Sequence, residues 1–285
     1  MTELITRVEG IADRFDHVLL DQWGVLHHGK DIFVEARDCV AALHERGKTI
    51  LILSNSGKRS ADNVRRITKS GLPPDLYDRV LSSGEVAWQG LRDRKTVPFT
   101  LVGRRCFLVS RDRDRGVVSG LELELVELEA ADFILLTGLD DAETDFGAWR
   151  ERLVAAAARQ LPMLCANPDL TMFTAAGLLP GPGALAQFYE NLGGNVAYVG
   201  KPHRLIFDAA LQVLGSPAPE RVLMIGDSLD TDIQGGRGAG ILTLMIMSGV
   251  HRDALVGATD ISASLQRLAG SEARMPHWAV DRLIW

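Results

Sequence analysis

Residues 17–26 read HVLLDQWGVL, and the rest of the chain is organised around this stretch. The apolar run of residues 18–20 ends in the carboxylate Asp21, and Gly24 follows three residues later. A short apolar run closed by a turn residue is typical of a buried strand that leads into a tight turn. We therefore expect Asp21 to lie at the end of a strand, where its carboxylate could serve as a nucleophile, a metal ligand or both.

The size and composition of the chain are those of an ordinary globular protein. Its 285 residues are 46% hydrophobic and 24% charged, which suits one large or two modest domains. The formal net charge of −6 argues against nucleic acid as the main partner but leaves small anionic substrates open. Neither a signal peptide nor an apolar stretch of ~20 residues is found, so we expect no membrane partner and a cytoplasmic location.

Strand-like and helix-like segments alternate along the chain. This order predicts an α/β fold, with a Rossmann-like parallel sheet and crossover helices. We expect strands at 49–53, 79–82, 221–225 and 242–247, and helices at 35–46, 60–70, 85–92 and 205–214.

The pattern changes near residue 95 and returns near residue 196, which indicates an inserted α/β unit. Within it we expect strands at 104–109, 121–126, 131–137 and 163–166 and a helix at 144–160, and we interpret Gly-Pro-Gly at 181–183 as a turn cluster. The sequence thus predicts a core of residues 1–96 plus 196–285, with a large inserted domain at 97–195.

Reactive side chains follow four of the expected strands: Asp21, Ser54, Lys201 and Asp227, with Asp232 about one helical turn after the last. In open parallel sheets, ligands bind at the carboxyl ends of the strands. Three carboxylates in one cleft would repel, each pair by roughly 4 kcal/mol at ~4 Å and an effective dielectric of ~20. A hard cation such as Mg²⁺ would relieve that repulsion, and Lys201 would supply a second positive charge.

This set of side chains suits phosphoryl transfer. The Ser54 hydroxyl and nearby backbone N–H groups could cradle the oxygens of a phosphoryl group. With its own charge shielded by the cation and Lys201, Asp21 could then attack phosphorus and form an aspartyl-phosphate.

Together these motifs resemble the haloacid dehalogenase (HAD) superfamily of aspartate-nucleophile phosphatases, and especially its NagD-like subfamily IIA. The resembling stretches are Asp21 with its strand, Leu53-Ser54-Asn55-Ser56, Gly200-Lys201-Pro202 and GDSLDTD at 226–232, followed by Ser248-Gly249-Val250. The resemblance implies an HAD hydrolase core with a large α/β cap inserted between the second and third motifs, where the cap helps to select the substrate. A homodimer formed through the cap is also compatible with it.

The resemblance further implies how the site is divided among residues. Mg²⁺ would be bound by Asp21, the backbone carbonyl of Trp23 and Asp227, with Asp232 behind them or bound through water. Ser54, Asn55 and Lys201 would contact the substrate, a small phosphorylated metabolite such as a sugar phosphate or nucleotide-like compound. Asn167 and Asp169 would contact it from a cap loop, although Asn-Pro-Asp is also a common turn.

Trp23 departs from the family pattern, because active members usually carry a second Asp there that handles the leaving-group proton. An indole N–H is a donor only and does not titrate near neutral pH. Losing general acid–base help costs typically ~10²–10⁴-fold in rate. His27 or His28 could be a substitute acid, since histidine titrates near neutrality.

Three interpretations of the chain follow from Trp23. It could be a phosphatase of small phosphomonoesters with weak activity, or an enzyme that uses the same aspartyl chemistry for a related reaction such as C–P bond cleavage. It could also be a catalytically impaired binding or regulatory protein that keeps the pocket. The retention of Asp21, Ser54, Lys201, Asp227 and Asp232 favours the phosphatase.

Overall fold

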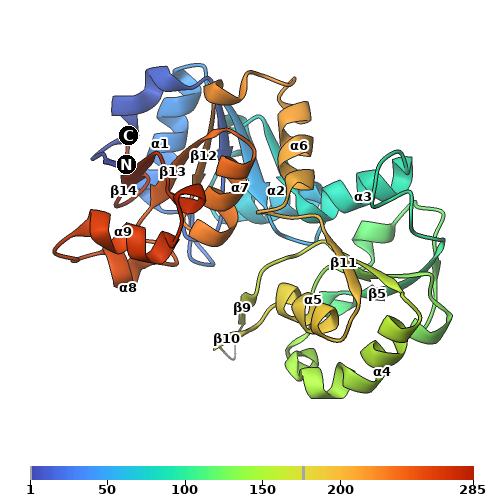
Figure 1. Cartoon of the computed structure of the whole chain (residues 1–285). Helices are drawn as coiled ribbons and strands as arrows, with labels where there is room; N and C mark the ends of the chain where they lie inside the picture. Colours follow the sequence, from blue (N-terminus) through green and yellow to red (C-terminus); the bar gives the residue numbers. More distant parts are fainter. Residues whose placement is uncertain (1, 175–176) are drawn as a thin grey trace. The chain divides into compact units, whose positions relative to one another are not determined.

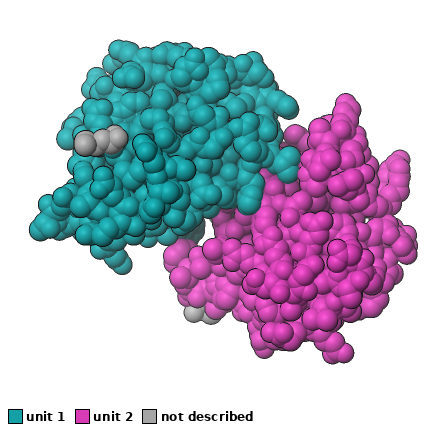
Figure 2. Space-filling view, in the orientation of Figure 1, with its two compact units in different colours: residues 1–54, 61–81, 201–285 teal, residues 55–60, 82–200 magenta. Residues whose placement is uncertain are grey.

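The computed structural model describes residues 2–174 and 177–285. The chain divides into two compact units, coloured separately in Figure 2. The first unit comprises residues 1–54, 61–81 and 201–285, and the second comprises residues 55–60 and 82–200. The described residues include no helix that is both long and apolar enough to cross a membrane.

A seven-stranded sheet forms the centre of the first unit, in the order β1-β14-β13-β12-β2-β3-β4 (Figure 1). The strands are β1 (Glu3–Leu4), β2 (His17–Leu20), β3 (Thr49–Ser54), β4 (Arg79–Ser82), β12 (Val222–Gly226), β13 (Leu242–Ile246) and β14 (Trp278–Val280). Strand β2 lies inside the sheet and pairs in parallel with β12 on one side and β3 on the other. The chain leaves β2 towards β3 and returns much later to β12, so a topological switch point lies at the end of β2.

Helices cover both faces of this sheet. Alternate residues of β13 belong to different apolar clusters: Leu244 packs in the cluster that contains Val40 of α1, and Met245 in the cluster that contains Leu265 of α9. This alternation is that of a strand buried on both faces, as in doubly wound folds. The helices of the unit are α1 (Val34–Glu45), α2 (Ser60–Lys69, whose first residue belongs to the second unit), α6 (Arg204–Val213), α7 (Gln234–Gly238), α8 (Arg252–Leu255) and α9 (Ile261–Ala269).

The second unit has a parallel five-stranded sheet of its own, in the order β11-β8-β7-β5-β6. Its apolar core joins Ile134 and Leu136 of the sheet to Leu153 and Leu185 of two helices. The elements are β5 (Arg105–Val109), β6 (Glu124–Leu125), β7 (Phe133–Leu136), β8 (Pro162–Cys165), β11 (Asn195–Tyr198), α3 (Ser83–Asp93), α4 (Phe146–Ala158), α5 (Pro182–Asn191) and the antiparallel hairpin β9 (Thr171–Thr174) and β10 (Gly177–Pro180). The predicted α/β class, with a Rossmann-like parallel sheet, is confirmed.

Two local predictions were wrong. The alternating segment 121–126 is a strand only at Glu124–Leu125, where it pairs with the first two residues of β5, because the chain bends at residues 121 and 122. Gly-Pro-Gly at 181–183 is not a turn cluster but the start of α5, with Pro182 in the first helical turn, where its missing N–H costs nothing.

The compact units also differ from the predicted division of the chain. Residues 55–60, 82–96 and 196–200 lie with the second unit, whereas the prediction placed them in the core. The assignment of 1–96 plus 196–285 as catalytic core and of 97–195 as cap stays a prediction.

Candidate active site

Three carboxylates and a lysine meet at the carboxyl edge of the first unit's sheet. Asp21 directly follows β2, Asp227 follows β12, and Asp232 lies in the one-turn helix Leu229–Ile233. Each of the three carboxylates has an oxygen within 4.8 Å of an oxygen of the other two. Lys201 Nζ donates to Asp21 Oδ1 at 2.5 Å and to Asp232 Oδ1 at 2.6 Å.

The pairing of β2 with β12 explains why Asp21 and Asp227 meet. Leu20 lies opposite Ile225 in the parallel register, and the Asp21 N–H extends the ladder by donating to the Ile225 carbonyl at 2.9 Å. Both strands are buried apolar runs, so their register is fixed by the core. The first polar residues beyond that core therefore emerge side by side.

Glycines surround two of these carboxylates closely. A Cβ on Gly24 would lie 1.9 Å from Asp227 Oδ2, and one on Gly249 would lie 2.2 Å from the same oxygen. A Cβ on Gly226 would lie 2.2 Å from the Asp232 Cγ atom. Gly24 also has a φ of +79°, a conformation that favours glycine. The backbone is thus wrapped around the acidic side chains and holds them in place.

Backbone N–H groups orient the same carboxylates. The Val250 N–H donates to Asp227 Oδ2 at 2.8 Å, and the Ser228 N–H donates to Asp232 Oδ2 at 3.2 Å. These donors come from the loop after β13 and from the turn after β12. The roles of Gly24, Gly249 and Val250 were not predictable from the sequence, because their contacts with Asp227 join segments that are distant in the chain. The contacts of Gly226 and Ser228 with Asp232 are local but depend on the shape of the turn after β12.

The electrostatics of the group indicate a site for a cation. Burial and the charges of Asp21 and Asp232 raise the pKa of Asp227 well above its usual range. Burial likewise raises the pKa of Asp232 to about 6, against the opposing effect of Lys201. Burial alone would lower the pKa of Lys201, but Asp21 and Asp232 outweigh it and raise that pKa. One ammonium does not balance three carboxylates, and hard oxygen donors suit Mg²⁺.

The predicted phosphate and substrate residues lie in both units. Ser54 is the last residue of β3 in the first unit and is buried. In the second unit, Asn55 Nδ2 donates to Asp169 Oδ1 at 2.8 Å, and the Asp169 N–H donates to Asn167 Oδ1 at 3.1 Å. The structure therefore brings Asn55, Asn167 and Asp169 together, and their contact with a substrate stays a prediction.

Trp23 lies between Asp21 and Gly24, in the segment that passes the Asp227 carboxylate, and 40% of its surface is exposed. Its ring meets that of His27 edge-on, with centroids 5.6 Å apart, and lies tilted against His28 at 6.5 Å. The role of its backbone carbonyl as a metal ligand stays a prediction.

The two candidate acids differ sharply. His27 is buried, its Nδ1 accepts from the Gly29 N–H at 3.0 Å, and burial lowers its pKa to about 4. Such a ring is neutral at pH 7 and supports the turn, which makes it a poor general acid. His28 is exposed and packs edge-on against Phe33 at 5.0 Å, so it is the more accessible of the two.

A doubly wound sheet that presents an aspartate, two further carboxylates and a lysine at its carboxyl edge defines a Rossmann-like hydrolase. Models of haloacid dehalogenase-like hydrolases match residues 18–124 and 198–268. The chain is similar to a haloacid dehalogenase-like hydrolase from Brucella suis 1330 whose crystal structure is known. The two sequences are 32% identical, the TM-score between the structures is 0.83, and the match covers 99% of this chain and 100% of that chain. The chain belongs to the haloacid dehalogenase-like hydrolase family.

Two relatives have more specific names. The 5'-nucleotidase YutF of Bacillus subtilis (strain 168) is 27% identical over 238 residues, 82% of this chain and 88% of its own. A glycerol phosphate phosphatase from Mycobacterium tuberculosis, solved in complex with calcium, is 25% identical in sequence. The TM-score between the two structures is 0.70, and the match covers 96% of this chain and 75% of that chain. Within the family, these relatives place the chain with the NagD-like phosphatases of subfamily IIA.

Proposed function

We propose that this phosphatase hydrolyses small phosphomonoesters with Mg²⁺, through an aspartyl-phosphate on Asp21. The observation that carries the proposal is the buried group in which Lys201 bridges Asp21 and Asp232 beside Asp227. A purely structural role for so many buried charges is unfavourable, because desolvation of each one costs several kcal/mol.

The residues present fit a divalent cation. Asp21 and Asp227 offer carboxylate oxygens within 4.8 Å of each other, and the raised pKa of Asp227 shows that its charge is poorly balanced by protein groups alone. Asp21, Asp227 and the Trp23 carbonyl would hold Mg²⁺, and Asp232 would support them. Bound there, the ion would neutralise charge on the phosphoryl oxygens and on Asp21.

The chain's own residues would then carry out two displacements at phosphorus. An Asp21 carboxylate oxygen attacks phosphorus while the bond from phosphorus to the ester oxygen breaks, and the leaving alcohol takes a proton. Lys201 holds Asp21 in one orientation through its 2.5 Å hydrogen bond, and Ser54 would bind a phosphoryl oxygen. Water then attacks phosphorus, which releases inorganic phosphate and restores Asp21.

Trp23 sets the expected substrate reactivity. Without a carboxyl group at that position, leaving groups that need little protonation should react best. His28 is the substitute acid that we favour, because His27 has a pKa of about 4 and is buried. The second candidate function, a binding or regulatory protein of the same fold, rests on Trp23 alone.

The relatives' names guide the proposed substrate class. Relatives called 5'-nucleotidase, acid sugar phosphatase and glycerol phosphate phosphatase support a small phosphorylated metabolite, either a sugar phosphate or a nucleotide-like compound. We propose that the second unit acts as a cap, with Asn167 and Asp169 contacting the substrate. A cytoplasmic location and a homodimer formed through the cap belong to the same proposal.

The test is hydrolysis of 4-nitrophenyl phosphate and a panel of metabolite phosphates with Mg²⁺. We expect activity in the wild type, none in Asp21→Asn, and a gain in Trp23→Asp that is largest for esters with poor leaving groups. Equal inertness of the wild type and Asp21→Asn across the panel would favour the binding protein. No gain in Trp23→Asp would point to an acid such as His28.

A further inference from the structure

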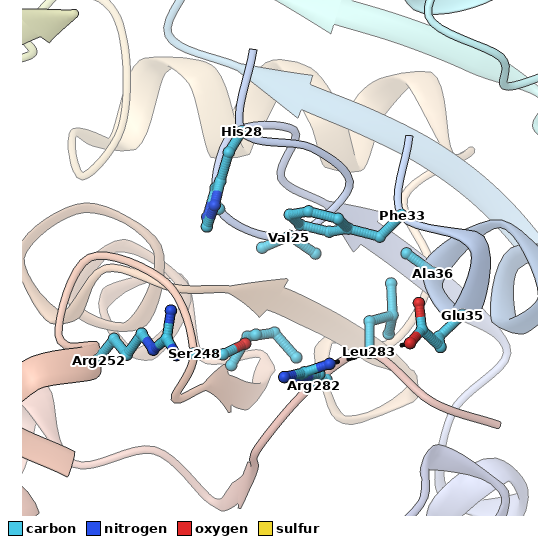
Figure 3. Close-up of a pocket in the computed structure, with 11 residues that line it drawn as sticks. Val25, His28, Phe33, Glu35, Ala36, Ser248, Arg252, Arg282 and Leu283 are labelled. Carbon is cyan, nitrogen blue, oxygen red and sulfur yellow. Dashed lines mark ion pairs between the residues drawn. The ribbon is translucent and has the colours of Figure 1, made fainter. Parts of the chain in front are cut away.

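A cavity lies in the first unit (Figure 3), and Gly24 in its wall also adjoins the Asp227 carboxylate. It has a volume of about 200 Å³ and lies between the segment 24–36 and the two segments 246–252 and 282–283. Apolar side chains form much of its wall: Val25, Phe33, Ala36, Ile246 and Leu283. The proposed function uses one residue of this wall, His28, and assigns no ligand to the space itself.

The remaining wall of the cavity is polar and carries two guanidinium groups and one carboxylate, that of Glu35. Arg252, Arg282, His28 and Ser248 all line it, as Figure 3 shows. Among the described residues, no carboxylate lies within 4.0 Å of the Arg252 guanidinium. Arg282 lies 3.9 Å from Glu35 and 3.7 Å from its chain neighbour Asp281, which is too far for a direct hydrogen bond in either case. Two arginines and one carboxylate thus face one apolar space, so positive charge is in excess there although the net charge of the protein is −6.

We propose that this cavity binds a small organic carboxylate with a compact apolar body, about the size of a benzene ring. An apolar cavity of ~150 Å³ holds a benzene molecule, so this cavity has room for a ring and a carboxylate. The arginine fork matches the planar carboxylate, and the apolar wall takes the ring. Such a combination of an apolar wall with a few convergent polar groups is usual for ligand sites.

The cavity shares two wall segments with the cradle of Asp227. Gly24 lines the cavity, and its Cα faces the Asp227 carboxylate. Ser248 also lines it and precedes Gly249 and Val250, which pack against and hydrogen-bond to Asp227. A ligand that orders both segments should therefore strengthen Mg²⁺ binding, and Mg²⁺ should strengthen ligand binding by the same factor. This coupling rests on the proposed function, whereas binding of the carboxylate does not.

Binding is tested by calorimetric titration of the full chain, free of metal, with benzoate. We expect saturable one-to-one binding in the millimolar range or tighter, and binding at least about tenfold weaker for benzyl alcohol, acetate and inorganic phosphate. Loss of one charge-assisted hydrogen bond in Arg252→Gln or Arg282→Gln should weaken benzoate binding by roughly tenfold. The matched control is Arg79→Gln, an exposed arginine at the start of β4, which should bind as the wild type does.

Several results would overturn the proposed site. One is the absence of saturable benzoate binding, and another is binding that both arginine variants leave unchanged. If inorganic phosphate bound as tightly as benzoate, the claim that the cavity selects ligands with an apolar ring would be refuted.

Coupling is tested by Mg²⁺ titration with and without saturating benzoate. At a benzoate concentration that just saturates the wild type, we expect Mg²⁺ affinity to rise about fivefold in the wild type and to rise less in Arg252→Gln, which binds benzoate more weakly. Bound benzoate without any effect on Mg²⁺ affinity would refute the coupling but not the site. Benzoate binding to a chain that hydrolyses no phosphomonoester would refute the proposed function and leave the site standing.

Discussion

Replacing Gly24 with alanine should displace the Asp227 carboxylate and weaken Mg²⁺ binding. The new Cβ would lie 1.9 Å from Asp227 Oδ2 and 2.5 Å from its Cγ, whereas ordinary contact begins at 3.4 Å. The carboxylate or the loop must therefore move by about 1.5 Å. Mg²⁺ demands near-ideal octahedral geometry, with oxygens at ~2.0–2.1 Å, so a shift of this size removes Asp227 as a ligand. We expect Mg²⁺ binding to weaken by at least about tenfold, or ~1.4 kcal/mol.

Gly47→Ala provides a matched control for this substitution. Gly47 has a φ of +71°, close to the +79° of Gly24, but a Cβ there would meet nothing within 4 Å. Both variants should therefore lose roughly 1–2 kcal/mol of stability from the left-handed backbone conformation. Only Gly24→Ala should also lose Mg²⁺ affinity.

The assay is the Mg²⁺ dependence of 4-nitrophenyl phosphate hydrolysis, with calorimetric Mg²⁺ titration of the folded variants as an independent readout. Thermal melting of both variants checks that each remains folded at the assay temperature. If Gly24→Ala keeps a Mg²⁺ half-saturation within about twofold of that of Gly47→Ala, Asp227 does not hold the metal as described.

Two further predictions concern the buried charges. Lys201→Met should abolish hydrolysis and destabilise the metal-free protein by roughly 3–5 kcal/mol at pH 8, because it leaves Asp232 buried without its cation. Part of that loss of stability should be regained at pH 5, where Asp232 takes up a proton in the folded variant. Urea unfolding at pH 8 and at pH 5 measures the free energy of unfolding of the variant and the wild type. An equal loss at both pH values would argue against an unpaired carboxylate. In the wild type, His27 has a pKa of about 4, below its unfolded value of ~6.5, so the unfolded chain binds a proton first as the pH falls. The free energy of unfolding should therefore decrease by roughly 1–2 kcal/mol between pH 7 and pH 5 through this residue, and His27→Asn should remove that part of the slope; an unchanged slope would contradict the assignment.

The central strands could be predicted from the sequence because their signal is local. The strands β2, β3 and β12 are continuous apolar runs that end in Asp21, Ser54 and Asp227, and the structure has them at nearly the expected positions. A buried parallel strand needs no alternation and is bounded by polar turn residues, so its end is visible in the sequence. The residues at these ends were visible for the same reason.

Other features depend on contacts that no local pattern contains. The short strands β1 and β14 have only two and three residues, and β1 forms the edge of the sheet because it pairs with β14 across nearly the full length of the chain. The fit of Gly24 against Asp227 joins segments about two hundred residues apart, and His27 proved buried only once the turn around it was known. The cavity beside Arg252 and Arg282 likewise required the structure.

The most direct test of the account is to trap phosphorylated Asp21 during turnover. Wild-type protein is mixed with Mg²⁺ and 4-nitrophenyl phosphate, quenched in acid within the first turnover, reduced with borohydride and digested for mass spectrometry. Because Trp23 cannot activate the hydrolytic water, the aspartyl-phosphate should accumulate, and Asp21 should be recovered as homoserine. Trp23→Asp should accumulate less aspartyl-phosphate than the wild type when both are quenched at the same time after mixing. Hydrolysis of the ester with Asp21 recovered unreduced, or with another carboxylate reduced instead, would contradict the account.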